Sequence, residues 1–180
     1  MTSDKPDTAD LLPIVMAPDP RLKAKTRLVT EADRETLRRV VPRMFATMYA
    51  APGIGLAAPQ VGLDLRLAVI DLQPDDKPAP ITLINPKIEK VSEDHAIREE
   101  GCLSIPGQYA NVTRPAGVTV SYEDMDGNRQ VIEADGLLAT CLQHEIDHLD
   151  GVLFVDHLSA LKRNMILRKM VKEKRLKKSS

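Results

Sequence analysis

The chain has 180 residues, a formal net charge of -1, and a composition that is 43% hydrophobic and 28% charged, which is ordinary for one soluble globular domain. Two cysteines are too few for a disulfide scaffold, and no apolar run is long enough to cross a bilayer. The near-neutral charge gives no global argument for a nucleic-acid or membrane partner.

The beginning of the chain is predicted to hold a loose tail over residues 1–12, followed by one long helix. The tail lacks the apolar run of a secretory signal and the Arg-rich character of a transit peptide, so we expect a cytoplasmic protein. Thr30 is a favourable N-cap for a helix from Glu31 to about Ala50, along which apolar residues recur at helical spacing. Pro42 lies inside this pattern and is expected to kink or split the helix.

The middle of the chain alternates irregular segments with β-like runs. Residues 51–62 contain three glycines and two prolines and are predicted to form a shaped loop whose small residues let the backbone approach a partner closely. Residues 99–107 are predicted to be a second irregular segment. Strands are expected at Leu65–Leu72, Ile81–Ile84, Lys87–Val91, Val118–Glu123 and Arg129–Glu133, the last two joined as a hairpin.

Two helices are predicted at the end of the chain. The first covers Leu137–Leu149 and ends at Asp150 and Gly151, and the second begins after Ser159 and is strongly basic as far as Lys178. There is no internal repeat and no linker of domain size. The order of one helix, several strands and two helices therefore favours an α+β fold in a single domain, 1–180.

The helix predicted over residues 137–149 carries the motif HExxH. Positions four apart share one face of a helix, so His144 and His148 can hold one metal ion. Glu145 lies beside the first histidine, where a carboxylate can take a proton from a metal-activated water and pass it to a leaving group. HExxH also arises by chance in ordinary helices, so the motif alone favours a catalytic metal only modestly over structural histidines.

A catalytic zinc or iron site normally has three protein ligands and one open position, so the motif needs a third ligand. A metzincin would have a histidine where this chain has Phe154. A thermolysin-like site would need Glu173, which lies in a basic and solvated tail, and His157 fits no recognised spacing. Cys102, in the second irregular segment, remains as the candidate for a His2Cys set.

Cys141 competes with Cys102, since it lies three residues before His144 on the same predicted helix. Three ligands within two turns of one helix give poor tetrahedral geometry. We therefore interpret Cys141 as a small buried hydrophobic residue, and a disulfide between the two cysteines is only weakly motivated.

Three segments resemble, in order, the three motifs of the peptide deformylase family. Gly53–Gln60 resembles GxGxAAxQ, Glu100–Ser104 resembles EGCxS, and His144–His148 resembles HExxH with matching flanks. Pro18–Leu22 is similar to the family's N-terminal turn. The resemblance covers the chain from about Ile14 to the last helix.

The resemblance implies a small α+β fold with antiparallel strands packed around the HExxH helix, an N-terminal helix and a basic C-terminal helix. It implies one metal ion held by Cys102, His144 and His148, usually Fe(2+) in the cell, with Zn(2+), Ni(2+) or Co(2+) able to take the same position. The implied reaction is hydrolysis of N-formyl-methionyl peptides to formate and a free amino terminus.

The resemblance also implies the role of each group in that reaction. Metal-bound water attacks the formyl carbon, and Glu145 acts as general acid/base. The oxyanion that forms needs donors, which by the family pattern are the Gln60 side-chain amide and the backbone N–H of Leu103.

Further positions are assigned to the substrate by the same motifs. The expected set is Gly53, Ile54, Gly55, Glu100, Gly101, Leu137 and Thr140. Ile54, Leu137 and Thr140 are expected to line the methionine pocket, whereas Glu100 supports the site through hydrogen bonds. Tyr109 stands where a branch of the family carries an arginine that helps to hold the substrate backbone, so this anchoring is expected to differ here.

The final helix combines a cationic stripe with an apolar one formed by Leu161, Met165 and Met170. The default interpretation is a solvated helix docked by its apolar side. Our hypothesis is that this helix contacts ribosomal RNA or protein near the exit of new chains. We expect a monomer that acts on nascent formyl-methionyl peptides. From the residues alone, a zinc endopeptidase and a non-catalytic, metal-stabilised ribosome-binding module stay open as alternatives.

Overall fold

The computed structural model describes residues 11–178, so most of the tail predicted over residues 1–12 lies outside the described residues. The fold is α+β. Its strands are β1 Gly55–Ala57, β2 Leu67–Ile70, β3 Ile81–Val91, β4 His95–Cys102, β5 Ile105–Pro115, β6 Gly117–Glu123 and β7 Arg129–Asp135, and its α-helices are α1 Arg34–Ala50, α2 Gly136–Leu149 and α3 Ala160–Lys178. Among residues 11–178, no helix has both the length and the apolar character that crossing a membrane requires.

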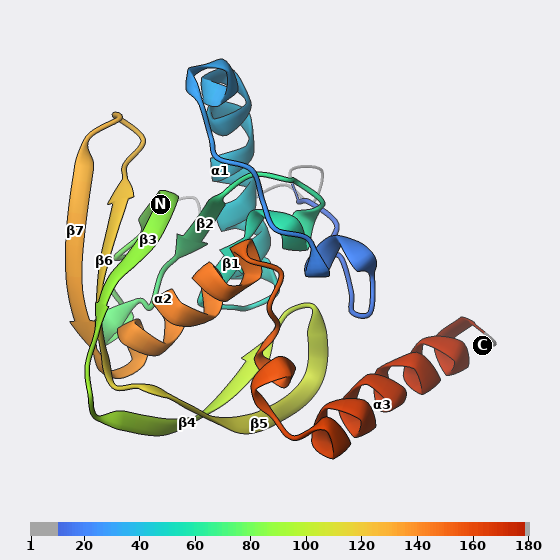
Figure 1. The fold of residues 1–180 in the computed structure, drawn as a ribbon. Helices are drawn as coiled ribbons and strands as arrows, with labels where there is room; N and C mark the ends of the chain where they lie inside the picture. The colour runs from blue at the N-terminus through green and yellow to red at the C-terminus, as the bar shows by residue number, and fades with distance from the viewer. Residues whose placement is uncertain (1–10, 179–180) are drawn as a thin grey trace.

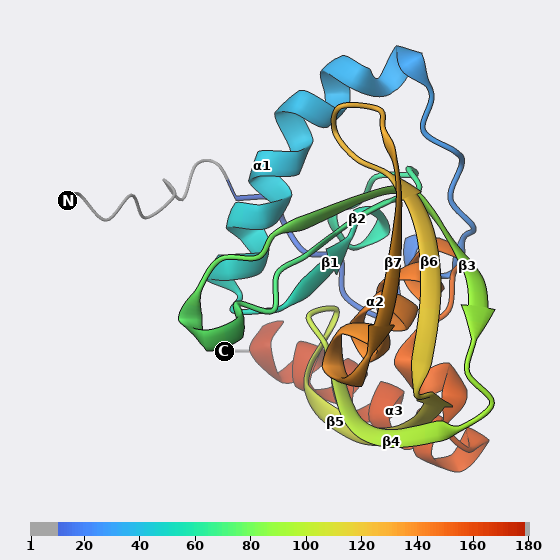
Figure 2. The same ribbon diagram turned by 90° about the vertical axis from the view of Figure 1, so that its left-hand side faces the viewer.

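The strands form two antiparallel sheets that enclose α2. The larger sheet has the order β1-β2-β3-β6-β7, and β4 pairs with β5 in a separate hairpin. Figure 1 shows α2 between the large sheet and this hairpin, and Figure 2 shows α1 beside β1 and β2. The helix that carries the HExxH motif is therefore central, as the resemblance implied.

Strand β2 divides its side chains between two hydrophobic cores, because alternate residues of a strand point to opposite faces of the sheet. Leu67 and Val69 pack in the core that includes the buried face of α1. Ala68 and Ile70 pack in the core that includes the buried face of α2. All four side chains have no exposed surface, so this short strand positions both helices.

Helix α1 begins after a single 3-10 turn and runs unbroken through Pro42, so of the two expected effects of this proline a split does not occur. Thr30 is the N-cap residue of this turn, as expected, but its side chain makes no capping hydrogen bond. Its backbone N–H instead donates to the Asp33 carboxylate. A proline inside a helix costs about 3 kcal/mol. The buried side chains on its apolar face, among them Met44 and Met48 with 0% exposure, contribute roughly 1.5–3 kcal/mol each. Packing against the sheet therefore outweighs the proline.

Two predictions for the middle of the chain were wrong. Residues 99–107 are not an irregular segment but the closed end of the β4–β5 hairpin, with a turn only at Leu103 and Ser104. The strands expected on either side of Asn85 are one strand, β3, with register shifts. Asn85 adopts a positive φ of 50°, and its side-chain amide pairs with both backbone polar groups of Val29. The sequence around Asn85 was therefore interpreted as a break between two strands, although β3 continues through this residue.

Helix α3 begins after Ser159 as predicted, since the Ser159 hydroxyl accepts the backbone N–H of Lys162 at 3.2 Å. Its apolar stripe was predicted only in part. Met170 is buried, but Leu161 is 72% exposed and Met165 is 51% exposed. Ile166 and Leu167 join Met170 in packing against the body. Figure 1 shows the rest of the helix extending away from the molecule.

Candidate metal centre and active site

Three side chains from two elements bring donor atoms together at the centre of the molecule. His144 and His148 lie on one face of α2, and Cys102 is the last residue of β4. The Cys102 Sγ lies 3.3 Å from the His148 Nε2, and the donor atoms of all three residues lie within 4.8 Å of one another. Cys102, which the search for a third ligand left as the candidate, thus lies where a His2Cys set requires it.

The chemistry of these groups fits a divalent metal ion. A thiolate and two imidazoles are donors that zinc and ferrous iron accept in tetrahedral sites. Burial lowers the pKa of His148 well below its ordinary value, which keeps the ring neutral and able to coordinate. His148 and Glu145 each hold one buried polar atom, Nδ1 and Oε2, that has no hydrogen-bond partner among residues 11–178.

Glu100 fixes the orientation of the His144 ring from behind. Its carboxylate accepts a hydrogen bond from the His144 Nδ1 at 2.9 Å and a two-pronged ion pair from Arg114. Burial acts to raise the pKa of Glu100, but the hydrogen bonds from His144 and Arg114 lower it to about 2. An ionised partner at Nδ1 leaves the other ring nitrogen free to bind a metal, an arrangement common to metal-binding histidines.

Arg114 extends this support towards the surface, and no sequence pattern pointed to it. It is 5% exposed and also donates to the Asp147 carboxylate at 2.8 Å. Asp147 in turn bonds to the ring of His157 at 2.8 Å. His157, one of the alternatives for the third metal ligand, therefore lies at the outer end of this network. Glu173, the other downstream alternative, is exposed on α3.

Glu145 is the buried carboxylate beside the donor cluster. It is 3% exposed, and burial raises its pKa to about 7. A group that titrates near neutral pH is suited to both taking and giving a proton. Gly55 lies against it so closely that a Cβ at position 55 would be 2.9 Å from the Glu145 carboxylate. A side chain at position 55 would therefore have to displace the Glu145 carboxylate.

Gln60 presents its NH2 group to the site. Its Oε1 accepts the backbone N–H of Ala57 at 2.9 Å, which assigns the amide orientation. The Nε2 then lies 3.4 Å from the Cys102 Sγ and 3.2 Å from the Ser104 hydroxyl. A donor is held beside the metal-ligand set, as an oxyanion site requires.

A cleft of about 710 Å³ opens over these groups. Its walls include Gly53, Ile54, Gly55, Gln60, Glu100, Gly101, Cys102, Leu103, Leu137, Thr140, His144 and Glu145, which are the expected site residues apart from His148. That histidine is 1% exposed and lies beneath them. Cys141 also touches the cleft but is 6% exposed, and burial raises its pKa, which suits an apolar packing role. Both cysteines are free thiols.

The N-terminal segment forms part of the cleft, and sequence reasoning missed this. Ile14 and Met16 line it. The backbone N–H of Val15, which lies between them, donates to the Gln60 carbonyl at 2.7 Å. The backbone N–H of Ala17 donates to the Ser104 carbonyl at 2.9 Å. This segment therefore joins the loop of the first motif to the hairpin of the second.

Tyr109 stands at the rim of the cleft, where a branch of the family carries arginine. It is 65% exposed, and its ring covers Gly101, since a Cβ there would lie 2.5 Å from the Tyr109 Cε1. The rim thus presents an aromatic surface rather than a cation.

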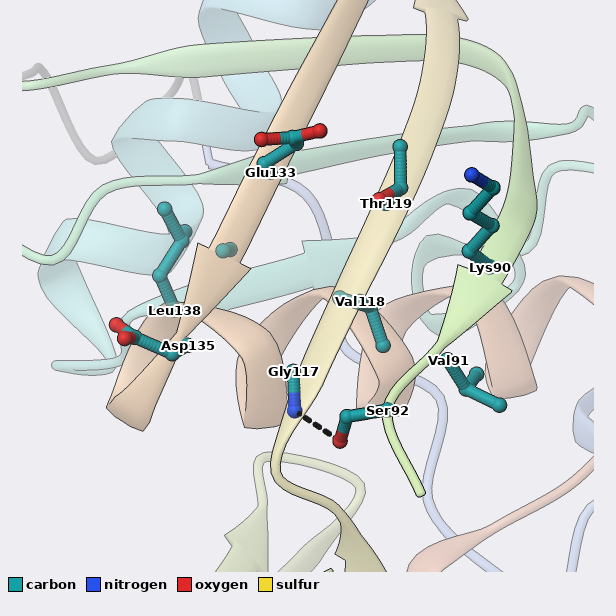
Figure 3. A pocket seen from close by; sticks show the side chains of 10 residues that line it. Lys90, Val91, Ser92, Gly117, Val118, Thr119, Glu133, Asp135 and Leu138 are labelled. Atoms are coloured by element: carbon teal, nitrogen blue, oxygen red, sulfur yellow. Dashed lines mark hydrogen bonds between the residues drawn. The ribbon is translucent and has the colours of Figure 1, made fainter. Parts of the chain in front are cut away.

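A second hollow lies over strands β3, β6 and β7 of the large sheet and the start of α2 (Figure 3). Lys90, Thr119 and Glu133 extend from three different strands there without converging on one point. The hydrogen bond drawn in this groove runs from the Gly117 backbone N–H to the Ser92 hydroxyl. We assign the chemistry to the cleft above α2 instead.

Comparison with known proteins places this geometry in context. The sequence pattern of the family described as Polypeptide deformylase matches residues 11–164. The peptide deformylase of Agrobacterium fabrum is 54% identical over 166 residues, which are 92% of this chain and 97% of the relative. That of Zymomonas mobilis is 51% identical over 175 residues, covering 94% of this chain and 98% of the relative.

Solved structures agree with the sequence comparison. The crystal structure of a peptide deformylase from Legionella pneumophila superposes with a TM-score of 0.87 at 48% identity, covering 94% of this chain and 99% of that one. The peptide deformylase from Ehrlichia chaffeensis in complex with actinonin also gives 0.87, at 42% identity, covering 92% of this chain and 98% of that one.

Proposed function

We propose residue roles for a chain that belongs to the peptide deformylase family, whose members are metal-dependent enzymes that remove the N-formyl group from N-terminal methionine. Cys102, His144 and His148 would hold the metal, and Glu145 would move the proton. The observation that carries this proposal is the convergence of the three donor atoms within 4.8 Å, next to a buried carboxylate with an unpartnered oxygen.

When bound, the metal supplies Lewis acidity and lowers the pKa of water so that hydroxide is available near neutral pH. Glu145 accepts the proton of the attacking water and delivers it to the leaving amine, a task for which its raised pKa is suited. The Gln60 amide and the Leu103 backbone N–H donate to the developing oxyanion. Losing one such donor typically lowers the rate by about 10²–10³-fold.

The cleft supports a formyl-methionyl substrate over one with a larger acyl group. Gly53 and Gly55 lie directly against Leu103 and Glu145, with no room for a Cβ. Formyl has only hydrogen on its carbonyl carbon, so it can enter such a closely walled space. Ile54, Leu137 and Thr140 would line the methionine pocket, and the first two are 41% and 49% exposed.

Fe(2+) is the metal that we propose, with Zn(2+), Ni(2+) or Co(2+) able to replace it. We expect anaerobically prepared Fe(2+) protein to release formate from a formyl-Met peptide at a rate well above that of the Zn(2+) form. Formate release and metal content would be measured on the same samples. A fully loaded protein that releases no formate with any of the four metals would overturn the proposed function.

The basic half of α3 supports a further proposal, that this helix contacts the ribosome. Residues 171–178 are all exposed and lie beyond Met170, the buried contact of the helix with the body. We expect deletion of residues 171–180 to weaken co-sedimentation with ribosomes, most strongly at low salt, because phosphate contacts release counterions. Exchanging the exposed Lys87 and Lys90 of β3 for glutamine is the control. Unchanged co-sedimentation of the deletion variant would contradict the proposal.

We also propose that residues 1–180 act as a single domain, as a monomer and in the cytoplasm. Family membership supports these assignments, and the fold offers one cleft with converging chemistry among residues 11–178. The molecular mass of the purified chain, measured by analytical sedimentation, would test whether it is a monomer.

A further inference from the structure

The segment Pro52–Ile54 forms a wall that is shared by two open hollows, and its residues Pro52 and Ile54 are exposed. On one side it lines the substrate cleft. On the other side it lines a second cavity of about 630 Å³, whose remaining walls include Tyr49, Asp71, Leu72, Gln73, Asp76 and Pro78. A wall with hollow space behind it is not held in place by packing there. Its position must therefore come from specific attachments.

The attachments of the wall are few and can be named. The Gly53 N–H donates to the Met48 carbonyl at 2.7 Å, and the Ile54 carbonyl accepts the backbone N–H of Asp71 at 2.9 Å. On the cleft side, Gly53 contacts Leu103. Asp71, the residue directly after β2, therefore holds Ile54 through its backbone N–H.

Asp71 is itself fixed by three donors. Its buried carboxylate, 1% exposed, accepts the backbone N–H groups of Gln73 at 2.9 Å and Ala79 at 3.0 Å, and the Tyr49 hydroxyl on the other oxygen. Burial acts to raise the pKa of Asp71, but these hydrogen bonds lower it, so the group is a carboxylate at neutral pH. Buried and ionised, it depends on all of its donors.

Of the three donors to Asp71, Tyr49 is the one that uses its side chain, and it lies on a different element from Asp71. It lies near the end of α1, where its ring stacks on Phe45 with centroids 6.1 Å apart, and it donates to the end of β2. Burial and the adjacent carboxylate raise its pKa to about 12, so it remains a donor. The Tyr49–Asp71 pair thus joins the helix that precedes the wall to the strand that holds it.

We propose that Tyr49 and Asp71 are positioning residues that set the place of Ile54, and through it the selectivity for the first side chain of the substrate. This inference rests on the proposed function, which assigns Ile54 to the methionine pocket. Neither residue lines the substrate cleft. Their effect must pass through the wall segment.

The test is Tyr49→Phe, which removes one hydroxyl and retains the ring that stacks on Phe45. We expect kcat/KM for a formyl-Met peptide, divided by kcat/KM for a formyl-Ala peptide, to fall about three- to tenfold. The main cause should be a higher KM for the formyl-Met peptide. The fall is less than the roughly 10²-fold loss that follows a 1 Å misplacement at a reacting centre, because the wall keeps its other attachments. Metal content should not change.

Tyr122→Phe is the matched control, since Tyr122 is a half-buried tyrosine of β6 outside both cavities. Asp71→Asn is the second variant and should lower the ratio in the same direction. A ratio unchanged in both variants, even with a lower Tm, would mean that the pair is only structural and would overturn the inference. A wild-type protein without formate release would instead overturn the proposed function, and this inference with it.

Discussion

Replacing Glu145 by glutamine is expected to lower kcat for a formyl-Met peptide by about 10²–10⁴-fold, the usual contribution of general acid–base catalysis. Glutamine has nearly the same shape but cannot accept and return a proton. Metal content should stay at the wild-type level, because Glu145 is not one of the three converging donors. Formate release and metal analysis of the same preparation measure both effects.

The matched control is Glu173→Gln, which makes the same change at an exposed position of α3 and should leave kcat unaltered. If Glu145→Gln kept activity within a few-fold of wild type, Glu145 would not be the proton carrier. If the variant lost its metal, the carboxylate would be part of the metal site instead.

Replacing Cys102 by serine is expected to have the second large effect, a loss of metal. Serine offers a hydroxyl in place of a thiolate, and neutral oxygen is a poor donor for the metals that prefer imidazole and sulfur. Changes even to groups that only support a ligand typically lower metal affinity by about 10–100-fold, so the loss of a ligand should exceed this. Competition with a chromophoric chelator would measure the affinity directly.

Cys141→Ser provides the control within the same chain. Cys141 touches the cleft and is buried, so this variant should be less stable to urea and yet keep its metal. Equal metal loss in both variants would point to general destabilisation and contradict the assigned role of Cys102.

The local motifs of the site could be predicted from the sequence, because each depends on short spacing. HExxH places two imidazoles on one helical face wherever a helix forms, and the glycines of the first motif correspond to close contacts that allow no Cβ. The search for a third ligand left Cys102, which lies beside His148 in the structure. None of these steps required knowledge of the tertiary arrangement.

The supporting contacts could not be predicted, because they join residues that no periodicity relates. Arg114 meets Glu100 and Asp147 only because the β4–β5 hairpin folds over α2. The Tyr49–Asp71 pair links a helix end to a strand end across 22 residues. Arg, Asp and Tyr are common in such positions for many reasons, so their types alone carry no signal.

The fold was predictable where the local signals were strong. The caps at Thr30 and Ser159 correctly marked two helix starts. Strand β4 was missed because three of its eight residues are charged and half of its side chains are exposed, so it shows no apolar alternation. Its stability comes from pairing with β5 along its whole length, which is a long-range property.

The two-faced burial of β2 has a consequence for how tolerant the enzyme is to insertions. With only four residues, the strand has a fixed parity, in which even positions face the catalytic helix and odd positions face α1. One residue added just before Leu67 would reverse that parity and present Leu67 and Val69 to α2. The helix that carries His144 and His148 would then rest on larger side chains than Ala68. Insertion scanning should therefore find this strand as sensitive as the proposed metal ligands, although none of its residues lines the substrate cleft.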